Sequence, residues 1–256
     1  MQATQEVRNK KVKSILITLP KPETDKSPYF ELAKKYNLKI DFRSFIHVEG
    51  VSAKEFRKEK INFADITAII FTSRNAVDHF YRVCEEMRYE VPAEMKYFCI
   101  SETIALYLQK YIQYRKRKIF FGKQTAADLA EVLKKHTTEK YLYPCSDVAA
   151  EETQKFLTVN GYDFKPAVLF RTVCSDLSDL AEVFYDVIAF FSPSSIHSLF
   201  INFPGFVQNE TRIAAFGANT HKAVLEHNLI LNIPAPTPVA PSMTMAIEQY
   251  IKQVNK

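Results

Sequence analysis

Residues 68–83, AIIFTSRNAVDHFYRV, contain one complete strand–turn–helix unit. The apolar run at 68–71 is rich in β-branched and aromatic residues and too short for a helix, which predicts a buried strand. A polar turn, TSRN, follows. Apolar residues then recur at helical spacing, with Ser73 or Asn75 available as the N-cap. The stretch therefore predicts one unit of an α/β sheet.

Residues 187–200, VIAFFSPSSIHSLF, repeat this plan in the same order. A strand is expected at 187–191, a turn rich in serine at 192–195, and a helix from Ile196. Because internal similarity of this kind indicates repeated architecture, two similar lobes are the first hypothesis for the chain.

The composition is that of an ordinary globular protein. The chain has 256 residues, of which 47% are hydrophobic and 25% charged, with a formal net charge of +5. This charge suits an anionic ligand and gives no argument for nucleic acid. The first residues lack the apolar core of a signal peptide, and no membrane-spanning run follows. The four cysteines form no CxxC pair, which favours reduced structural thiols in a cytoplasmic protein.

The rest of the chain alternates predicted strands and helices. A strand at 14–19 and a helix at 27–36 come first, and βα units follow through the middle of the chain. Two extended runs, 39–48 and 167–174, are expected to pair as linker strands. A helix at 177–185 and further βα units then complete the chain. The expected domains are residues 11–37 with 176–256 and residues 52–165, with linker strands at 38–51 and 166–175.

Strands that alternate with helices predict parallel sheets covered by helices on both faces. The fold class expected is therefore α/β, with two doubly wound, flavodoxin-like lobes joined by a two-stranded linker. The first domain is discontinuous because one βα unit alone cannot bury both faces of a sheet.

Hydroxyl and amide side chains follow most of the predicted strands. In such sheets ligands bind at the carboxyl ends of the strands, where helix N-termini also meet. Each of these residues could simply cap a helix, but an N-cap also borders free N–H groups that attract anions. They are Thr72, Ser73, Asn75, Ser101, Thr103, Thr125, Ser146, Ser192, Ser194, Ser195, Asn219 and Thr220.

Several common catalytic motifs are missing. The five glycines form neither a Gly-x-Gly-x-x-Gly turn nor a Walker loop, and no serine lies in a nucleophile elbow. The histidines lack metal-ligand spacing; His221 and His227 are expected on the surface of one helix. The basic run at 115–118 is interpreted as a solvated loop that opposes a helix dipole rather than as a nucleic-acid site.

The paired motifs at 70–77 and 190–196, followed by IAAFGANT at 213–220 and PAPTP at 234–238, resemble uroporphyrinogen-III synthases. The resemblance covers nearly the whole chain and implies two α/β lobes joined by a two-stranded linker. It also implies cyclisation of hydroxymethylbilane to uroporphyrinogen III, with inversion of ring D, in porphyrin and heme biosynthesis. Loss of the substrate hydroxyl gives a cation that the pyrrole stabilises, so the reaction requires no metal and no cofactor. The only partner expected is this small molecule, bound by a monomer.

The resemblance also implies the site residues. Thr220 is the candidate catalytic residue, and the substrate carboxylates are expected to bind to hydroxyls, amides, helix N-termini and a few cations. The candidate substrate-binding residues are Ser73, Asn75, Ser101, Thr103, Ser146, Arg171, Ser192, Ser194, Gly217, Asn219 and Thr220.

Two positions depart from the family pattern. The first strand ends in Leu19-Pro20 where relatives often have Arg-Pro, and Phe170 lies where relatives often have tyrosine. An alternative function therefore stays open: a two-lobed protein that binds or senses an anionic ligand, related to these enzymes but without catalytic activity.

Overall fold

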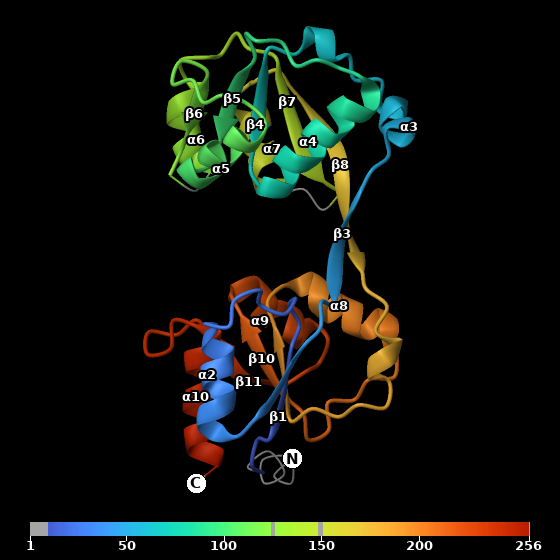
Figure 1. The fold of residues 1–256 in the computed structure, drawn as a ribbon, viewed down its shortest axis with the longest axis vertical. Helices are drawn as coiled ribbons and strands as arrows, with labels where there is room; N and C mark the ends of the chain where they lie inside the picture. Colours follow the sequence, from blue (N-terminus) through green and yellow to red (C-terminus); the bar gives the residue numbers. More distant parts are fainter. Residues whose placement is uncertain (1–9, 124–125, 148–150, 256) are drawn as a thin grey trace. The chain divides into compact units, whose positions relative to one another are not determined.

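The computed structural model describes residues 10–123, 126–147 and 151–255. The chain divides into two compact units. Unit 1 comprises Met1–His47 and Val173–Lys256, and unit 2 comprises Val48–Thr172. Figure 1 shows unit 1 in blue and in orange to red, whereas unit 2 runs from cyan to yellow. Unit 1 is therefore built from both ends of the chain.

Unit 1 contains a five-stranded parallel sheet in the order β11-β10-β9-β1-β2. Numbered along the unit, this order is 2-1-3-4-5, the flavodoxin-like arrangement predicted for the lobes. The strands are β1 (Ser14–Ile17), β2 (Lys39–Phe42), β9 (Val187–Phe190), β10 (Arg212–Phe216) and β11 (Leu231–Ala235).

Alternating side chains bury both faces of this sheet. Ile15 and Ile17 pack with the helices α2 (Pro28–Tyr36) and α10 (Met243–Val254), whereas Leu16 points to the other face. That second face is covered by α8 (Pro193–Asn202) and α9 (Ala218–Glu226). The helices α2 and α10 are also tied together, because Glu248 accepts hydrogen bonds from Lys35 Nζ at 2.7 Å and Tyr36 Oη at 2.9 Å.

Unit 2 contains a six-stranded sheet in the order β3-β8-β7-β4-β5-β6. The five strands from β4 to β8 give the order 3-2-1-4-5, so this sheet is doubly wound but follows the other common order and not that of flavodoxin. The strands are β3 (Ile46–Gly50), β4 (Ala68–Phe71), β5 (Lys96–Cys99), β6 (Ile119–Phe121), β7 (Tyr141–Ser146) and β8 (Phe164–Cys174).

Helices cover both faces of the second sheet as well. The helices are α3 (Ala53–Phe56), α4 (Arg74–Met87), α5 (Glu102–Tyr107), α6 (Ala126–Leu133) and α7 (Glu151–Val159). Phe80 and Val83 of α4 belong to the core on one face, and Leu129 and Leu157 of α6 and α7 belong to the core on the other. Short 3-10 turns lie at Arg57–Glu59, Phe63–Asp65, Leu108–Lys110 and, in unit 1, Ser178–Leu180.

The stretch that opened the sequence analysis folds as its pattern predicts. The strand β4 is fully buried, and Ser73 begins α4 by accepting a hydrogen bond from the Ala76 N–H at 3.0 Å. The buried side of α4 includes Val77 and Phe80. All four cysteines are free, and three of them are buried.

Two predicted elements were wrong. The expected linker strand at 39–48 is in fact two strands, since β2 pairs with β1 at the edge of the unit 1 sheet and only β3 lies beside β8. The alternating pattern arose because an edge strand is covered unevenly. The helix expected at 177–185 is replaced by one 3-10 turn, because Arg43 binds the Asp179 carboxylate at 3.1 Å and the Asp176 carbonyl at 2.7 Å and holds this segment in an irregular path.

Candidate active site

The carboxyl edge of the unit 1 sheet brings several predicted site residues together. Strands β1, β9 and β10 are neighbours, and Thr18, Ser192 and Gly217 follow their carboxyl ends. The strand order reverses between β1 and β9, and such a switch point is where doubly wound sheets bind ligands.

Ser192 begins α8 at this edge. Its hydroxyl accepts a hydrogen bond from the Ser195 N–H at 3.2 Å, so the capping interpretation of Ser192 is confirmed. Ser194 lies in the first turn and is half-buried, and its N–H has no acceptor within the helix. The first turn of α8 thus has a backbone N–H group without an intrahelical acceptor, next to the serine that caps the helix.

Thr220 is placed by an unusual backbone turn. Gly217 has φ 88° and ψ 150°, a conformation open essentially to glycine alone, and its N–H donates to the Ala235 carbonyl at 2.7 Å. Two residues into α9, Asn219 is exposed, whereas Thr220 is only 2% exposed. The Thr220 hydroxyl makes no hydrogen bond to any residue that the structure describes. A buried polar group without a partner is uncommon and indicates that something else binds there.

His221 fixes the start of α9 next to Thr220. Its Nε2 lies 2.9 Å from both the Ala215 and the Ala235 carbonyl oxygens, at the ends of β10 and β11. Both histidines predicted on this surface are partly exposed, and each also makes a contact that the sequence did not predict. His227 follows α9 and stacks on Phe200 at a centroid distance of 4.5 Å. Their spacing in the sequence gave no signal of these contacts.

The carboxyl edge of unit 2 gathers a second group. Strands β4 and β5 are neighbours, so Ser73 and Asn75 lie near the strand end that Ser101 and Thr103 follow. Ser101 begins α5 without a side-chain capping bond, and Asn75 and Thr103 are exposed. These groups are open to a ligand, apart from Ser73, whose oxygen caps α4.

Ser146 ends β7, on the other side of β4, where the strand order of unit 2 reverses. Beneath this edge lies Tyr143, which sequence analysis missed. It is 1% exposed, and burial raises its pKa, while the side chains of Thr72 and Thr153 approach its hydroxyl and oppose that shift. Thr125, another candidate, lies outside the described residues.

Arg171 and Phe170 differ from the expectation of open site residues. The Arg171 guanidinium forms an ion pair with Glu55, and the hydrogen bond from Arg171 lowers the pKa of Glu55. Phe170 is 7% exposed and stacks on His79 at 5.1 Å, so its ring is part of the core rather than of an open edge. Burial lowers the pKa of His79 and favours the neutral ring in this stack.

Together the two edges offer hydroxyls, amides and helix N-termini, with few acids. Within residues 10–123, 126–147 and 151–255, no three His, Cys, Asp or Glu side chains cluster as a metal site would require. Such donors can bind and orient carboxylates and stabilise charge. Donors of this kind suit chemistry that depends on positioning the substrate.

The family profile described as "Uroporphyrinogen-III synthase HemD" matches residues 27–245. The chain belongs to the uroporphyrinogen-III synthase family. It is therefore a cyclising lyase of tetrapyrrole biosynthesis. This confirms the resemblance that the paired strand–turn–helix motifs indicated.

Solved structures of uroporphyrinogen-III synthases have the same fold. The enzyme from Helicobacter pylori is 17% identical, with a TM-score of 0.61 over 94% of this chain and 99% of that one. A mutant of the enzyme from Thermus thermophilus is 14% identical, with a TM-score of 0.57 over 94% and 99%. No curated protein sequence matches the chain directly. Of the helices that the structure describes, none has the length and apolar character needed to cross a bilayer.

Proposed function

We propose that Thr220 is the catalytic residue with which this uroporphyrinogen-III synthase closes hydroxymethylbilane to uroporphyrinogen III. The observation that supports this role is its hydroxyl, which is buried, has no partner among the described residues, and lies in the first turn of α9. The neighbouring N–H groups of that turn also have no intrahelical acceptor. A substrate carboxylate or the departing hydroxyl would satisfy donors that the folded chain leaves open.

The other candidate residues bind the substrate carboxylates. Around Thr220 these are Ser192, Ser194, Gly217 and Asn219 in unit 1. In unit 2 they are Ser73, Asn75, Ser101, Thr103, Ser146 and Arg171. Since Ser73 already accepts a bond from its own helix, it would contribute through its hydroxyl proton and the adjacent backbone N–H groups. The Ser192 hydroxyl also donates to Ser195 Oγ at 3.3 Å, so Ser192 would contribute through the adjacent backbone N–H groups.

The reaction requires little acid–base catalysis by the protein. Departure of the substrate hydroxyl leaves a cation that the pyrrole stabilises, and the enzyme then directs which carbon of ring D attacks. We infer a monomeric, cytoplasmic enzyme that uses no cofactor and whose product serves porphyrin and heme synthesis. Catalysis would come from orientation and from the electrostatics of fixed donors.

The direct test is incubation with freshly prepared hydroxymethylbilane and separation of the porphyrin isomers after oxidation. Without an enzyme the substrate closes to isomer I, so we expect a clear excess of isomer III over the protein-free blank. The variant Thr220→Val should lose most of that excess. If the natural protein gives only isomer I but binds the substrate, the chain is the non-catalytic binding protein considered above, and the proposal fails. Size-exclusion chromatography tests the proposal that the enzyme is a monomer.

A further inference from the structure

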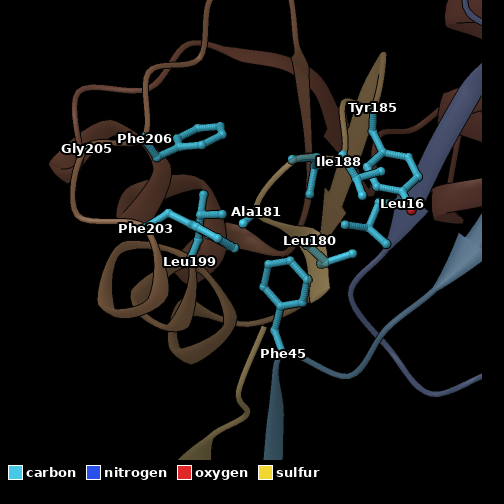
Figure 2. A pocket seen from close by; sticks show the side chains of 11 residues that line it. Leu16, Phe45, Leu180, Ala181, Tyr185, Ile188, Leu199, Phe203, Gly205 and Phe206 are labelled. Atoms are coloured by element: carbon cyan, nitrogen blue, oxygen red, sulfur yellow. The ribbon is translucent and has the colours of Figure 1, made fainter. Parts of the chain in front are cut away.

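Unit 1 contains an apolar cavity of about 390 Å3 that the proposed reaction does not use. Figure 2 shows side chains from several segments converging on it, among them Phe45, Phe203 and Phe206. Small-molecule sites are typically concave, mostly apolar and about 300–1,000 Å3 in volume. Its lining comprises Leu16, Phe45, Leu180, Ala181, Val183, Tyr185, Ile188, Leu199, Phe203, Gly205 and Phe206.

The cavity exists because one helix of the doubly wound pattern is missing. Leu16 and Ile188 are paired residues of β1 and β9 that face it, and the segment before β9 covers them with a single 3-10 turn. Ala181 and Val183 of this segment remain exposed at the rim. A full helix would have buried this part of the sheet, whereas the irregular segment leaves it open.

None of the residues that line the cavity is a candidate site residue of unit 1. Phe203 and Phe206 follow the end of α8 and precede β10, so they lie toward the amino ends of the strands. Ser192 and Thr220 lie at the carboxyl ends. Phe45 follows the carboxyl end of β2, and Thr220 is not among the residues that line the cavity.

A second, polar hollow of about 420 Å3 adjoins the cavity and shares Leu16, Leu180 and Tyr185 with it. Both of its carboxylates are already paired. Asp41 accepts a hydrogen bond from the Tyr185 hydroxyl at 2.9 Å and lies 2.9 Å from Lys39 Nζ. Asp179 is bound by Arg43.

Lys21 also lines this polar hollow. Among the described residues it forms no ion pair, so the charge left open to a ligand is positive. Arg43, the other cation of this lining, is paired with Asp179, so the apolar chamber lies beside one cation that has no ion-pair partner among the described residues.

We propose that the two hollows form a second binding site, for an organic anion with a planar or compact apolar body and one acidic group. The apolar body fills the chamber between Phe45, Phe203 and Phe206. The acidic group reaches Lys21. The chamber has more than twice the volume of the roughly 150 Å3 cavity that accommodates benzene, so it has room for two or three fused rings.

Two fluorescent probes test this proposal on the full chain. Anilinonaphthalene sulfonate is an aromatic anion, and N-phenylnaphthylamine has the same ring skeleton without the charge. We expect saturable binding of one probe molecule per chain, with the anion bound about threefold more tightly, as one exposed ion pair allows.

Three variants locate the bound probe, and a fourth serves as the control. Ala181→Trp fills the cavity from its exposed rim and should weaken both probes at least tenfold. Gly205→Trp is a second filling variant, since an added Cβ there has no atom within 4 Å. Lys21→Gln should weaken only the anionic probe. Ala64→Trp makes the same change at an exposed position of unit 2 and should leave both affinities unchanged.

The proposal fails if neither probe binds saturably to the natural protein, or if both cavity-filling variants keep full affinity while unfolding cooperatively in urea. Equal affinity for the two probes, unchanged in Lys21→Gln, would overturn the assignment of an anionic ligand. If the natural protein forms no isomer III, only the proposed function is overturned. The probe experiment does not depend on catalytic activity.

Discussion

The substitution Thr220→Val tests whether the Thr220 hydroxyl is catalytic or structural. The two roles predict opposite changes in the free energy of unfolding. Valine keeps the β-branched shape and removes only the hydroxyl. That hydroxyl is 2% exposed and has no protein partner among the described residues, so the folded state gains nothing from it. An unpartnered buried polar group costs about 1–3 kcal/mol.

We therefore expect Thr220→Val to leave the free energy of unfolding unchanged or to raise it by about 1 kcal/mol, which moves Tm upward by about 4 °C. Formation of isomer III should fall tenfold or more, equivalent to a rise of about 1.4 kcal/mol in the barrier. Urea denaturation measures the first quantity, and isomer analysis under initial-rate conditions measures the second.

Thr211 provides the matched control. It is 5% exposed, and its hydroxyl donates to the Tyr185 carbonyl at 3.0 Å, at the amino edge of the same sheet. The same substitution there should cost about 1–3 kcal/mol of stability and leave the activity of the folded protein unchanged. If Thr220→Val behaves like Thr211→Val, losing stability while keeping activity, Thr220 is structural and the proposed role is wrong.

Three further substitutions test other parts of the structure. Gly217→Ala should lower the free energy of unfolding by about 1–3 kcal/mol in urea titrations, because alanine is strained at φ 88°; an unchanged midpoint would contradict that backbone conformation. Glu55→Gln releases Arg171 from an exposed ion pair, so the urea midpoint should stay nearly unchanged while KM for hydroxymethylbilane falls; a rise in KM would mean that the pair itself orients Arg171. Hydrogen bonds from Lys35, Tyr36 and Lys252 together lower the pKa of Glu248 from its ordinary 4.5 to about 2, so these contacts stabilise the fold above about pH 4.5 and are lost as the pH falls toward 2. The Tm difference between the natural protein and Glu248→Gln should accordingly shrink over that interval, and a constant difference would refute the coupling.

The sequence predicted the α/β architecture well because its buried strands are short, apolar and followed by clear caps. The strands at 68–71 and 187–190 and the serines that cap the following helices are strong local signals. The run at 39–48 was misread because alternation reports only partial exposure, and an edge strand and a linker strand are exposed alike. The strand order of each sheet could not be predicted either, because no local sequence signal distinguishes the order 2-1-3-4-5 from the order 3-2-1-4-5.

The candidate site was predictable in its positions but not in its contacts. Hydroxyls after strand ends were visible in the sequence. A sequence cannot tell Ser73, which caps α4, from Thr220, whose hydroxyl has no partner among the described residues. The ion pair of Arg171 with Glu55 and the stack of Phe170 on His79 join residues far apart in the chain. The irregular segment before β9 was predicted as a helix because its apolar spacing is helical, whereas the competing contacts from Arg43 depend on the tertiary fold.

The discontinuity of unit 1 affects how the protein folds during its synthesis on the ribosome. β1 lies between β2 and β9, and Ile15 is paired with Val187. During synthesis, which adds about 5–20 residues per second, β1 and β2 emerge early and wait through the whole of unit 2 before their partner strands exist. Until then, the edge of β1 that later pairs with β9 is unpaired and apolar, the kind of edge that promotes aggregation. Premature stops or slow translation in the last third of the chain should therefore harm unit 1 and spare unit 2, whose strands β4 to β8 are consecutive in the sequence.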